Sequence, residues 1–320
     1  MPIQPFHRSK TIIAVAVVLT LTCTLYGCLS FPSASANAVE HEKKIVIPGK
    51  GIAVYAAGDI AECGKLPPHD SGAAKTAEVI TANLAQDQAA VVLTLGDNSY
   101  PLGVPAEFTD CYHPTWGQFK TRTHPSSGNH EYYTPSANGY FNYFGAAAGP
   151  APAFYYSFDL GKWHLLSLNS NLKGDARLAE LAWIKSDLAQ HNTRCTLAYW
   201  HHPLFSSGGH GNNADMREFW LALEAAHADI VLNGHDHDYE RFAPQDDNGQ
   251  SDEAHGIREF VVGTGGAKLT RLFLRKANSE FADSSTHGIL KLVLKDAGYE
   301  WEFLPVAGGT LTDRGAALCH

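Results

Sequence analysis

The sequence repeats one arrangement, in which an apolar run of strand length ends in a short polar segment. The clearest case is the run at 89–95, which is rich in β-branched residues and leads into Gly-Asp-Asn-Ser-Tyr at 96–100. A run of this kind is typical of a strand buried on both faces. Open α/β sheets bind their ligands where such strands end. The segment therefore predicts an α/β fold with a functional site that includes Asp97 and Tyr100.

Four other polar segments have the same character. The runs at 52–57, 196–200 and 229–232 lead into Gly-Asp, His-His-Pro and Asn-Gly-His-Asp-His, and Gly-Asn-His-Glu lies between them at 128–131. The five segments supply carboxylates, a phenol, an amide and imidazoles, which are all metal-binding groups. A single aspartate after a strand is usually a turn or cap residue, but its recurrence in this pattern indicates a metal site.

The N-terminal segment has the features of an export signal. A basic start at 7–10 precedes an apolar core at 11–25 and a small-residue cleavage site at 36–38. We therefore predict a signal peptide over 1–38 and a secreted protein, extracellular or periplasmic. One alternative is a membrane anchor, for which the apolar core is short. Another is a lipid anchor at Cys28, whose context resembles a bacterial lipoprotein signal except for a bulky tyrosine.

Size and charge limit the remaining chain. Removal of 1–38 leaves 282 residues with 22 basic and 33 acidic side chains, a formal charge of −11. This length suits one large α/β domain or two small ones, and because no repeat or linker divides the chain, we expect a single domain over 45–320. The acidic balance argues against nucleic acid or an anionic membrane as the main partner.

Four cysteines lie outside the predicted signal, an even number that is typical of an exported, disulfide-bonded chain. We predict that Cys63 pairs with Cys111, because both flank site segments. We predict that Cys195 pairs with Cys319, which would fix the C-terminus.

The other segments predict a mixed fold. Ser71 is a plausible N-cap for a helix with apolar positions as far as Leu84, which would join two parallel strands. The segment 101–144 is aromatic and is expected to be rich in loops. Strand-like runs are at 153–160, 163–168, 259–262, 288–294 and 299–304, and helical spacing is at 178–190 and 216–227.

In order along the chain, the five polar segments closely resemble the five sequence blocks of the calcineurin-like metallophosphoesterases. A tyrosine three residues after the second aspartate, here Tyr100, is the feature of the purple acid phosphatases in that superfamily. The resemblance implies an α/β (α+β) fold: a two-sheet β-sandwich flanked by helices, in four αββα layers. Plant-type members carry an additional N-terminal domain for which this chain has no room, so the chain resembles the compact type. Its Tyr-Glu-Arg at 239–241, however, resembles the longer type.

The resemblance also implies a binuclear metal site. Fe(III) is favoured at the position with the phenolate, and a divalent Fe, Zn or Mn ion at the other. Asp97 would bridge the two ions. The first ion would be held by Asp59, Asp97, Tyr100 and His237, and the second by Asp97, Asn129, His201 and His235.

Of the two adjacent histidines, His201 matches the His-x-Pro pattern, so we expect His202 to support the site or to pack beside it. The resemblance further assigns His130 and His210 to orienting the phosphate and protonating the leaving group. Two roles are considered for Glu131: neutralising nearby histidines and capping a helix. Asp236 is expected to point away from the metals. Two roles are also considered for Arg241: a structural ion pair and contact with phosphate.

These assignments predict a secreted phosphatase that hydrolyses small phosphate monoesters with a metal-activated water, that is, an acid phosphatase. One alternative is a phosphodiesterase or nucleotide hydrolase on the same site. An alternative of another class is a non-hydrolytic iron-binding or redox protein, which would have no use for His130 and His210.

Overall fold

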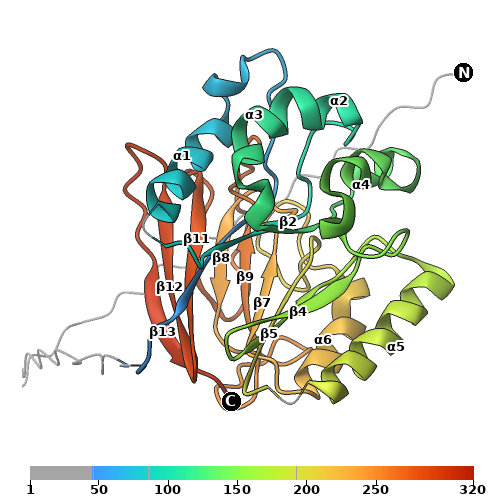
Figure 1. Cartoon of the computed structure of the whole chain (residues 1–320). Helices are drawn as coiled ribbons and strands as arrows, with labels where there is room; N and C mark the ends of the chain where they lie inside the picture. Colours follow the sequence, from blue (N-terminus) through green and yellow to red (C-terminus); the bar gives the residue numbers. More distant parts are fainter. Residues whose placement is uncertain (1–44, 46, 86, 192) are drawn as a thin grey trace, which may run out of the picture. The chain divides into compact units, whose positions relative to one another are not determined.

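Two β-sheets pack against each other in the computed structural model of the chain, which describes residue 45 and residues 47–320 apart from 86 and 192 (Figure 1). Within these residues, the first sheet has the strand order β13-β12-β11-β1-β2-β3 and the second has the order β10-β8-β9-β7-β6-β5-β4. The strands of the first sheet are β1 (Ile52–Ala57), β2 (Val91–Leu95), β3 (Thr123–Ser126), β11 (Gly288–Lys295), β12 (Gly298–Pro305) and β13 (Arg314–Leu318). Those of the second are β4 (Tyr156–Leu160), β5 (Trp163–Ser167), β6 (Cys195–Tyr199), β7 (Ile230–Asn233), β8 (Tyr239–Phe242), β9 (Arg258–Val262) and β10 (Ser279–Asp283).

Parallel strands bring the polar segments to one edge of the molecule. In the first sheet β1 pairs with β2 and β2 with β3, all in parallel, and in the second β5, β6, β7 and β9 are parallel neighbours. The five predicted polar segments follow β1, β2, β3, β6 and β7. Because parallel strands end on the same side of a sheet, these segments meet without any long excursion of the chain.

Alternation along the strands of the second sheet builds two separate cores. Leu197 of β6, Ile230 of β7 and Phe260 of β9 belong to the core between the sheets, and the residue after each of them belongs to a second core with Ile184 and Trp220. Both faces of this sheet are therefore buried, which explains the continuous apolar runs in the sequence. Helices α5 (Gly174–Gln190) and α6 (Arg217–Glu224) cover the outer face (Figure 1).

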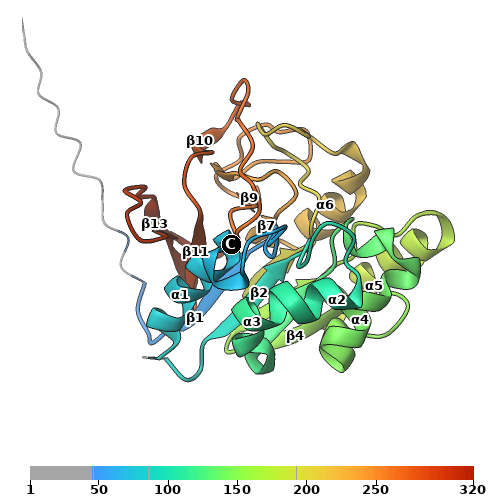
Figure 2. The same cartoon turned by 90° about the horizontal axis from the view of Figure 1, so that it is seen from above.

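The outer face of the first sheet is covered by α1 (Gly72–Leu84), which packs on β11 and β12, and the short α3 (His113–Thr115) packs on α1 (Figure 2). Ser71 caps α1 as predicted, because its Oγ accepts a hydrogen bond from the backbone N–H of Ala74 at 3.2 Å. The first residue of the helix, Gly72, has to be a glycine, since a Cβ there would lie 2.2 Å from the carbonyl oxygen of Gly266. This close approach brings the start of α1 against the loop that follows β9. The predicted fold class, a two-sheet sandwich between helical layers, is confirmed.

The segment 101–144 is more regular than expected. It is filled by short helical pieces and contains strand β3, which the sequence pattern does not reveal because Thr-His-Pro-Ser has no apolar run. Its aromatic side chains pack on one another, as in the contact of Phe108 with Tyr143 at 5.3 Å between ring centroids. The pieces are α2 (Pro105–Glu107), the π-helical η2 (Phe108–Tyr112), α3, and the 3₁₀ turns η3 (Trp116–Arg122), η4 (Glu131–Tyr133) and η5 (Pro135–Ala137), followed by α4 (Asn138–Phe144). The remaining 3₁₀ turns are η1 (Pro68–Asp70), η6 (Gly145–Ala148) and η7 (Ala214–Met216).

Both predicted disulfides are confirmed. Cys63 is bonded to Cys111 over a sequence separation of 48, and Cys195 to Cys319 over a separation of 124. The second bond joins the start of β6 to the end of β13. It therefore links the last strand of the first sheet to the middle of the second.

The predicted signal peptide over 1–38, with its cleavage site and Cys28, lies outside the described residues. Among the residues that are described, no helix combines the length and the apolar character that a membrane span needs.

Because a crosslink stabilises mainly by restricting the unfolded chain, the two disulfides should differ in effect. We expect replacement of both Cys195 and Cys319 by alanine to lower the free energy of unfolding by about 3–5 kcal/mol. The disulfide between Cys63 and Cys111 closes a shorter loop, so replacing both of its cysteines by alanine should lower the free energy of unfolding by about 1 kcal/mol less. Urea titration of both variants measures the difference. Equal losses would show that strain or residual structure, rather than loop entropy, decides the contribution.

Candidate metal centre

The phenol of Tyr100 lies at the centre of one half of the site. Its hydroxyl is 2.8 Å from Asp59 Oδ1, 3.2 Å from Asp97 Oδ2 and 3.2 Å from His237 Nε2. The ring is almost fully buried, and both carboxylates are inaccessible to solvent. These four side chains come from the loops after β1, β2 and β7, and their polar atoms converge on one point.

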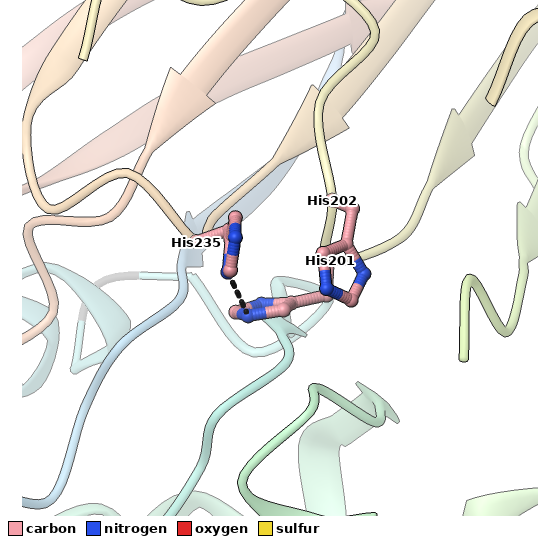
Figure 3. Close-up of side chains that lie close together, drawn as sticks. All are labelled: His201, His202 and His235. Atoms are coloured by element: carbon pink, nitrogen blue, oxygen red, sulfur yellow. Dashed lines mark hydrogen bonds between the residues drawn. The ribbon is translucent and has the colours of Figure 1, made fainter. Parts of the chain in front are cut away.

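His201 lies at the centre of the other half. Its Nε2 is 3.1 Å from Asn129 Oδ1, 3.2 Å from Asp97 Oδ2 and 3.2 Å from His235 Nδ1. Figure 3 shows the ring of His235 directed at the edge of the His201 ring. The same oxygen of Asp97 thus faces both halves, and all seven predicted ligands form one continuous cluster.

Three of the seven residues have an uncommon backbone conformation. Asp59, Asp97 and His235 have φ values of 58°, 48° and 73°. A non-glycine residue in this left-handed region is strained, and such residues persist where the surrounding structure holds them. One restraint is direct, since Asp59 Oδ2 accepts a hydrogen bond from the backbone N–H of His235 at 2.8 Å. Strain and ligand candidates therefore coincide at the same positions.

Glu131 provides the largest restraint, in a role that neither sequence-based alternative describes. Its buried carboxylate accepts backbone N–H groups from both sides: Asp97 at 3.0 Å, Asn98 at 2.7 Å, Ser99 at 3.3 Å and Gly128 at 2.6 Å. Burial and the charge of Asp97 raise the pKa of Glu131 to about 8, against the lowering effect of the N–H groups. One side chain therefore fixes the loop after β2 to the loop after β3.

Backbone carbonyls orient two of the imidazoles. His201 Nδ1 donates to Leu95 O at 2.9 Å, and His237 Nδ1 donates to Lys268 O at 2.8 Å. With the proton placed on Nδ1, the lone pair of Nε2 is directed into the cluster, as metal-ligating histidines require. Gly96 is needed for this arrangement, because it has φ +83° and a Cβ there would lie 2.6 Å from the His201 ring.

The cluster is rich in acceptors and contains no lysine or arginine ion pair to Asp59 or Asp97 among the described residues. Burial opposes ionisation of these two carboxyls, but facing histidines outweigh it and lower the pKa of both. In return, although burial acts against protonation, the carboxylates raise the pKa of His201 and of His237 to about 9. Burial and neighbouring histidines lower the pKa of His235 to about 2. Carboxylate, phenol, amide and imidazole groups facing one another in this way fit metal cations.

His130 and His210 lie on the solvent side of the cluster. The side chain of His130 is 24 % exposed, with Nε2 3.7 Å from Asp97 Oδ2, and that of His210 is 53 % exposed. The His210 ring packs on His235 with 4.1 Å between centroids. Both rings therefore border the buried cluster while remaining open to a ligand.

Asp236 positions His210, which sequence reasoning did not anticipate. As predicted, its side chain turns away from the metal-ligand cluster. Its carboxylate accepts from His210 Nδ1 at 3.0 Å and from the backbone N–H of His210 at 2.8 Å. Ser206 Oγ donates to the other oxygen at 2.5 Å. In the sequence, the signal for this role is the aspartate at the middle of His-Asp-His.

His202 lies closer to the cluster than alternation of side chains suggests. One ring nitrogen from each of His201, His202 and His235 lies within 4.8 Å of the others (Figure 3). The Nδ1 of His202 is 2.8 Å from Ser170 Oγ, however, and burial together with the His201 charge lowers its pKa to about 2. His202 is thus a neutral side chain held beside the cluster by the β5–α5 loop.

Arg241 is structural. Its guanidinium pairs with Asp313 at 2.8 Å and with Glu280, and Tyr239 donates to the same Asp313 at 2.7 Å. These contacts connect β8 to the chain just before β13 and leave no role in the site for this arginine.

We expect Glu131→Gln to weaken the site and the fold together. A glutamine turns an N–H₂ group toward buried N–H donors, so the free energy of unfolding should fall by about 2 kcal/mol or more. The metal retained after dialysis should fall as well. Urea titration and metal analysis test both. The control is Glu107→Gln, since Glu107 also accepts two backbone N–H groups, from Leu102 and Val104, at the surface. An unchanged Glu131→Gln protein would contradict this role.

Comparison with known proteins identifies the family of the chain. Residues 52–239 match the family described as Calcineurin-like phosphoesterase. Purple acid phosphatase 15 of Arabidopsis thaliana is 29% identical over 197 residues, which are 50% of this chain and 37% of the relative. Purple acid phosphatase 22 of the same plant is 28% identical over 241 residues, which are 66% of this chain and 53% of the relative.

Among solved structures, purple acid phosphatase PPD1 from yellow lupin (Lupinus luteus) seeds aligns with a TM-score of 0.65 and 21% identity, over 85% of this chain and 54% of that one. This likeness shows the fold. The chain spans about half or less of the length of the two curated relatives. The family match covers more than half of the chain and includes every polar segment except the last residues of the Tyr-Glu-Arg ending. The chain belongs to the calcineurin-like phosphoesterase family, and its curated relatives include purple acid phosphatases.

Proposed function

We propose that the chain is a secreted acid phosphatase that hydrolyses phosphate monoesters at a binuclear metal centre. The supporting observation is the continuous cluster of seven acceptor-rich side chains in which Asp97 Oδ2 faces both Tyr100 and His201. Two buried carboxylates without a lysine or arginine partner among the described residues are costly unless cations neutralise them. The two disulfides fit an oxidising compartment and so support export.

The two halves of the cluster suit different ions. The half around Tyr100 offers carboxylate and phenolate oxygens and would favour Fe(III), and the half around His201 offers an amide oxygen and imidazoles and would favour a divalent Fe, Zn or Mn ion. When bound, two such ions supply Lewis acidity toward phosphate oxygens and lower the pKa of a water molecule. The protein's part is to hold the ligands apart from bulk water and to fix their orientation.

His130 and His210 would handle the phosphate and the leaving group. His130 Nδ1 bonds to Pro101 O at 2.6 Å, and His210 Nδ1 bonds to the Asp236 carboxylate at 3.0 Å. In both rings Nε2 is left to contact the ester. The carboxylate of Asp236 raises the pKa of His210, since their hydrogen bond outweighs burial. A protonated His210 can therefore donate a hydrogen bond to a phosphate oxygen and its proton to the departing alkoxide.

A visible absorption spectrum tests the first metal position, because phenolate bound to Fe(III) gives a charge-transfer band. We expect such a band in the purified protein, its loss in Tyr100→Phe, and its retention in Tyr133→Phe. Tyr133 is a suitable control because it is exposed and contacts His130 without joining the cluster. Two bound metals with phosphatase activity and no band would rule out Fe(III) on Tyr100.

Matched substrates test the reaction. We expect p-nitrophenyl phosphate to be hydrolysed faster than bis(p-nitrophenyl) phosphate, and His210→Ala to lower kcat on the monoester by about 10²–10⁴-fold with metal content unchanged. Asp97→Ala should lose metal and activity together, and His255→Ala, a change at a surface histidine, should lose neither. Preference for the diester would favour a phosphodiesterase. Bound metal without turnover of either ester would favour the non-hydrolytic iron protein.

A further inference from the structure

The loop between β9 and β10 places a basic and apolar segment beside the site. Residues 268–276, which we name the β9–β10 rim, read Lys-Leu-Thr-Arg-Leu-Phe-Leu-Arg-Lys. This segment holds four basic residues and no acidic one, in a chain whose formal net charge is −9. The local charge is thus opposite to that of the whole protein.

The tip of the rim exposes two large apolar side chains. Phe273 is 74 % exposed and Leu274 is 86 % exposed, the highest values among the large apolar residues that the structure describes. Exposing two adjacent apolar side chains to water costs free energy, and such a patch usually marks an interaction site. In Figure 2 the loop between β9 and β10 projects from the body of the molecule.

Hydrogen bonds fasten the rim to the site on both sides. Lys268 O accepts from His237 Nδ1 at 2.8 Å, and Thr270 N donates to His237 O at 3.0 Å. Further along, the N–H of Phe273 donates to Ser207 O at 3.1 Å, in the loop that carries His210. The N–H of Lys276 donates to Ser207 Oγ at 2.8 Å. The exposed tip is therefore held at the border of the metal centre.

The basic side chains of the rim are not engaged in ion pairs among the described residues, although the Glu62 carboxylate accepts the backbone N–H of Lys268 at 2.8 Å. Within the described part of the chain, none of its lysine or arginine side chains has a carboxylate oxygen within 4 Å. Arg275 bonds only to Ser279, through its side-chain and backbone oxygens. At physiological ionic strength charges are screened beyond about 8 Å, so this local positive charge acts at short range despite the acidic remainder of the surface.

We propose that the β9–β10 rim binds the surface of an anionic phospholipid aggregate, and that the preferred substrates are phosphate monoesters carried on lipid. A lipid surface uses both features, since Phe273 and Leu274 enter the boundary of the acyl chains while the flanking cations contact phosphate headgroups. A small hydrophilic ester would use the cations and leave the apolar pair in water. The binding part stands by itself, and the substrate part rests on the proposed phosphatase function.

Vesicle sedimentation tests binding without relying on activity. We expect the protein to bind vesicles of phosphatidylcholine with phosphatidic acid or with phosphatidylglycerol, and not vesicles of phosphatidylcholine alone. The double variant Phe273→Ser/Leu274→Ser should bind about tenfold more weakly or worse. Arg271→Gln/Lys276→Gln should lose the response to anionic lipid, and added salt should weaken binding of the unmodified protein.

The matched control removes one leucine and one cation at a distance from the site. Leu221 of α6 and Lys185 of α5 are both exposed and border a groove between these helices. The variant Lys185→Gln/Leu221→Ser should bind vesicles like the unmodified protein. Vesicle binding that the rim variants do not change, or no binding to either anionic vesicle, would overturn the proposal. Binding to phosphatidic acid alone would also overturn it, because the phosphate monoester site rather than the rim would then be responsible.

Kinetics test the substrate part. We expect Phe273→Ser/Leu274→Ser to lower kcat/KM for phosphatidic acid in mixed micelles by about tenfold, with kcat/KM for p-nitrophenyl phosphate changed less than about twofold. An equal loss on both substrates would contradict a role at the lipid surface. If neither ester is hydrolysed, the proposed phosphatase function fails, while the sedimentation result still decides whether the rim binds lipid.

Discussion

The hydrogen bonds of one buried carboxylate hold the candidate metal centre together. Glu131 accepts N–H groups from the loop after β2 and from the loop after β3, and so it connects Asp97 with the segment that carries Asn129 and His130. These N–H groups are buried and would otherwise lack partners at a cost of about 1–3 kcal/mol each. The carboxylate thereby offsets part of the strain of Asp97, whose φ of 48° aims its side chain at both halves of the site.

Hydrogen bonds to Nδ1 orient several imidazoles of the site. In the cluster, His201 and His237 each donate Nδ1–H to a backbone carbonyl, and the bond of His201 to Leu95 O also joins the two sheets. At the border, His130 also uses a backbone carbonyl, Pro101 O, whereas His210 uses the carboxylate of Asp236. A carbonyl fixes the tautomer of a neutral ring, whereas a carboxylate also favours the protonated form. The carboxylate of Asp236 therefore suits His210 to proton donation.

Much of this arrangement can be predicted from the sequence, for identifiable physical reasons. Four of the five polar segments follow apolar strands that are buried on both faces, so these strands and the site residues after them are read from one pattern. The Ser71 cap and both disulfides depend on few residues and were predicted correctly. Strand β3 was missed because Thr-His-Pro-Ser carries no periodicity, and the role of Glu131 because it depends on two loops that are adjacent only in the folded chain.

The net charge of the whole chain does not describe the charge of every part of its surface. An acidic chain is a poor partner for an anionic membrane as long as its charges are spread evenly. In this fold the bonds to His237 and Ser207 hold the β9–β10 rim, which has four basic residues and no acidic one, at the border of the candidate metal centre, with Phe273 and Leu274 at its tip. Because screening confines electrostatic effects to about a Debye length, the charge that a ligand meets is that of the rim rather than that of the protein. The relevant quantity is the charge within reach of the site, which requires the folded arrangement of the loops.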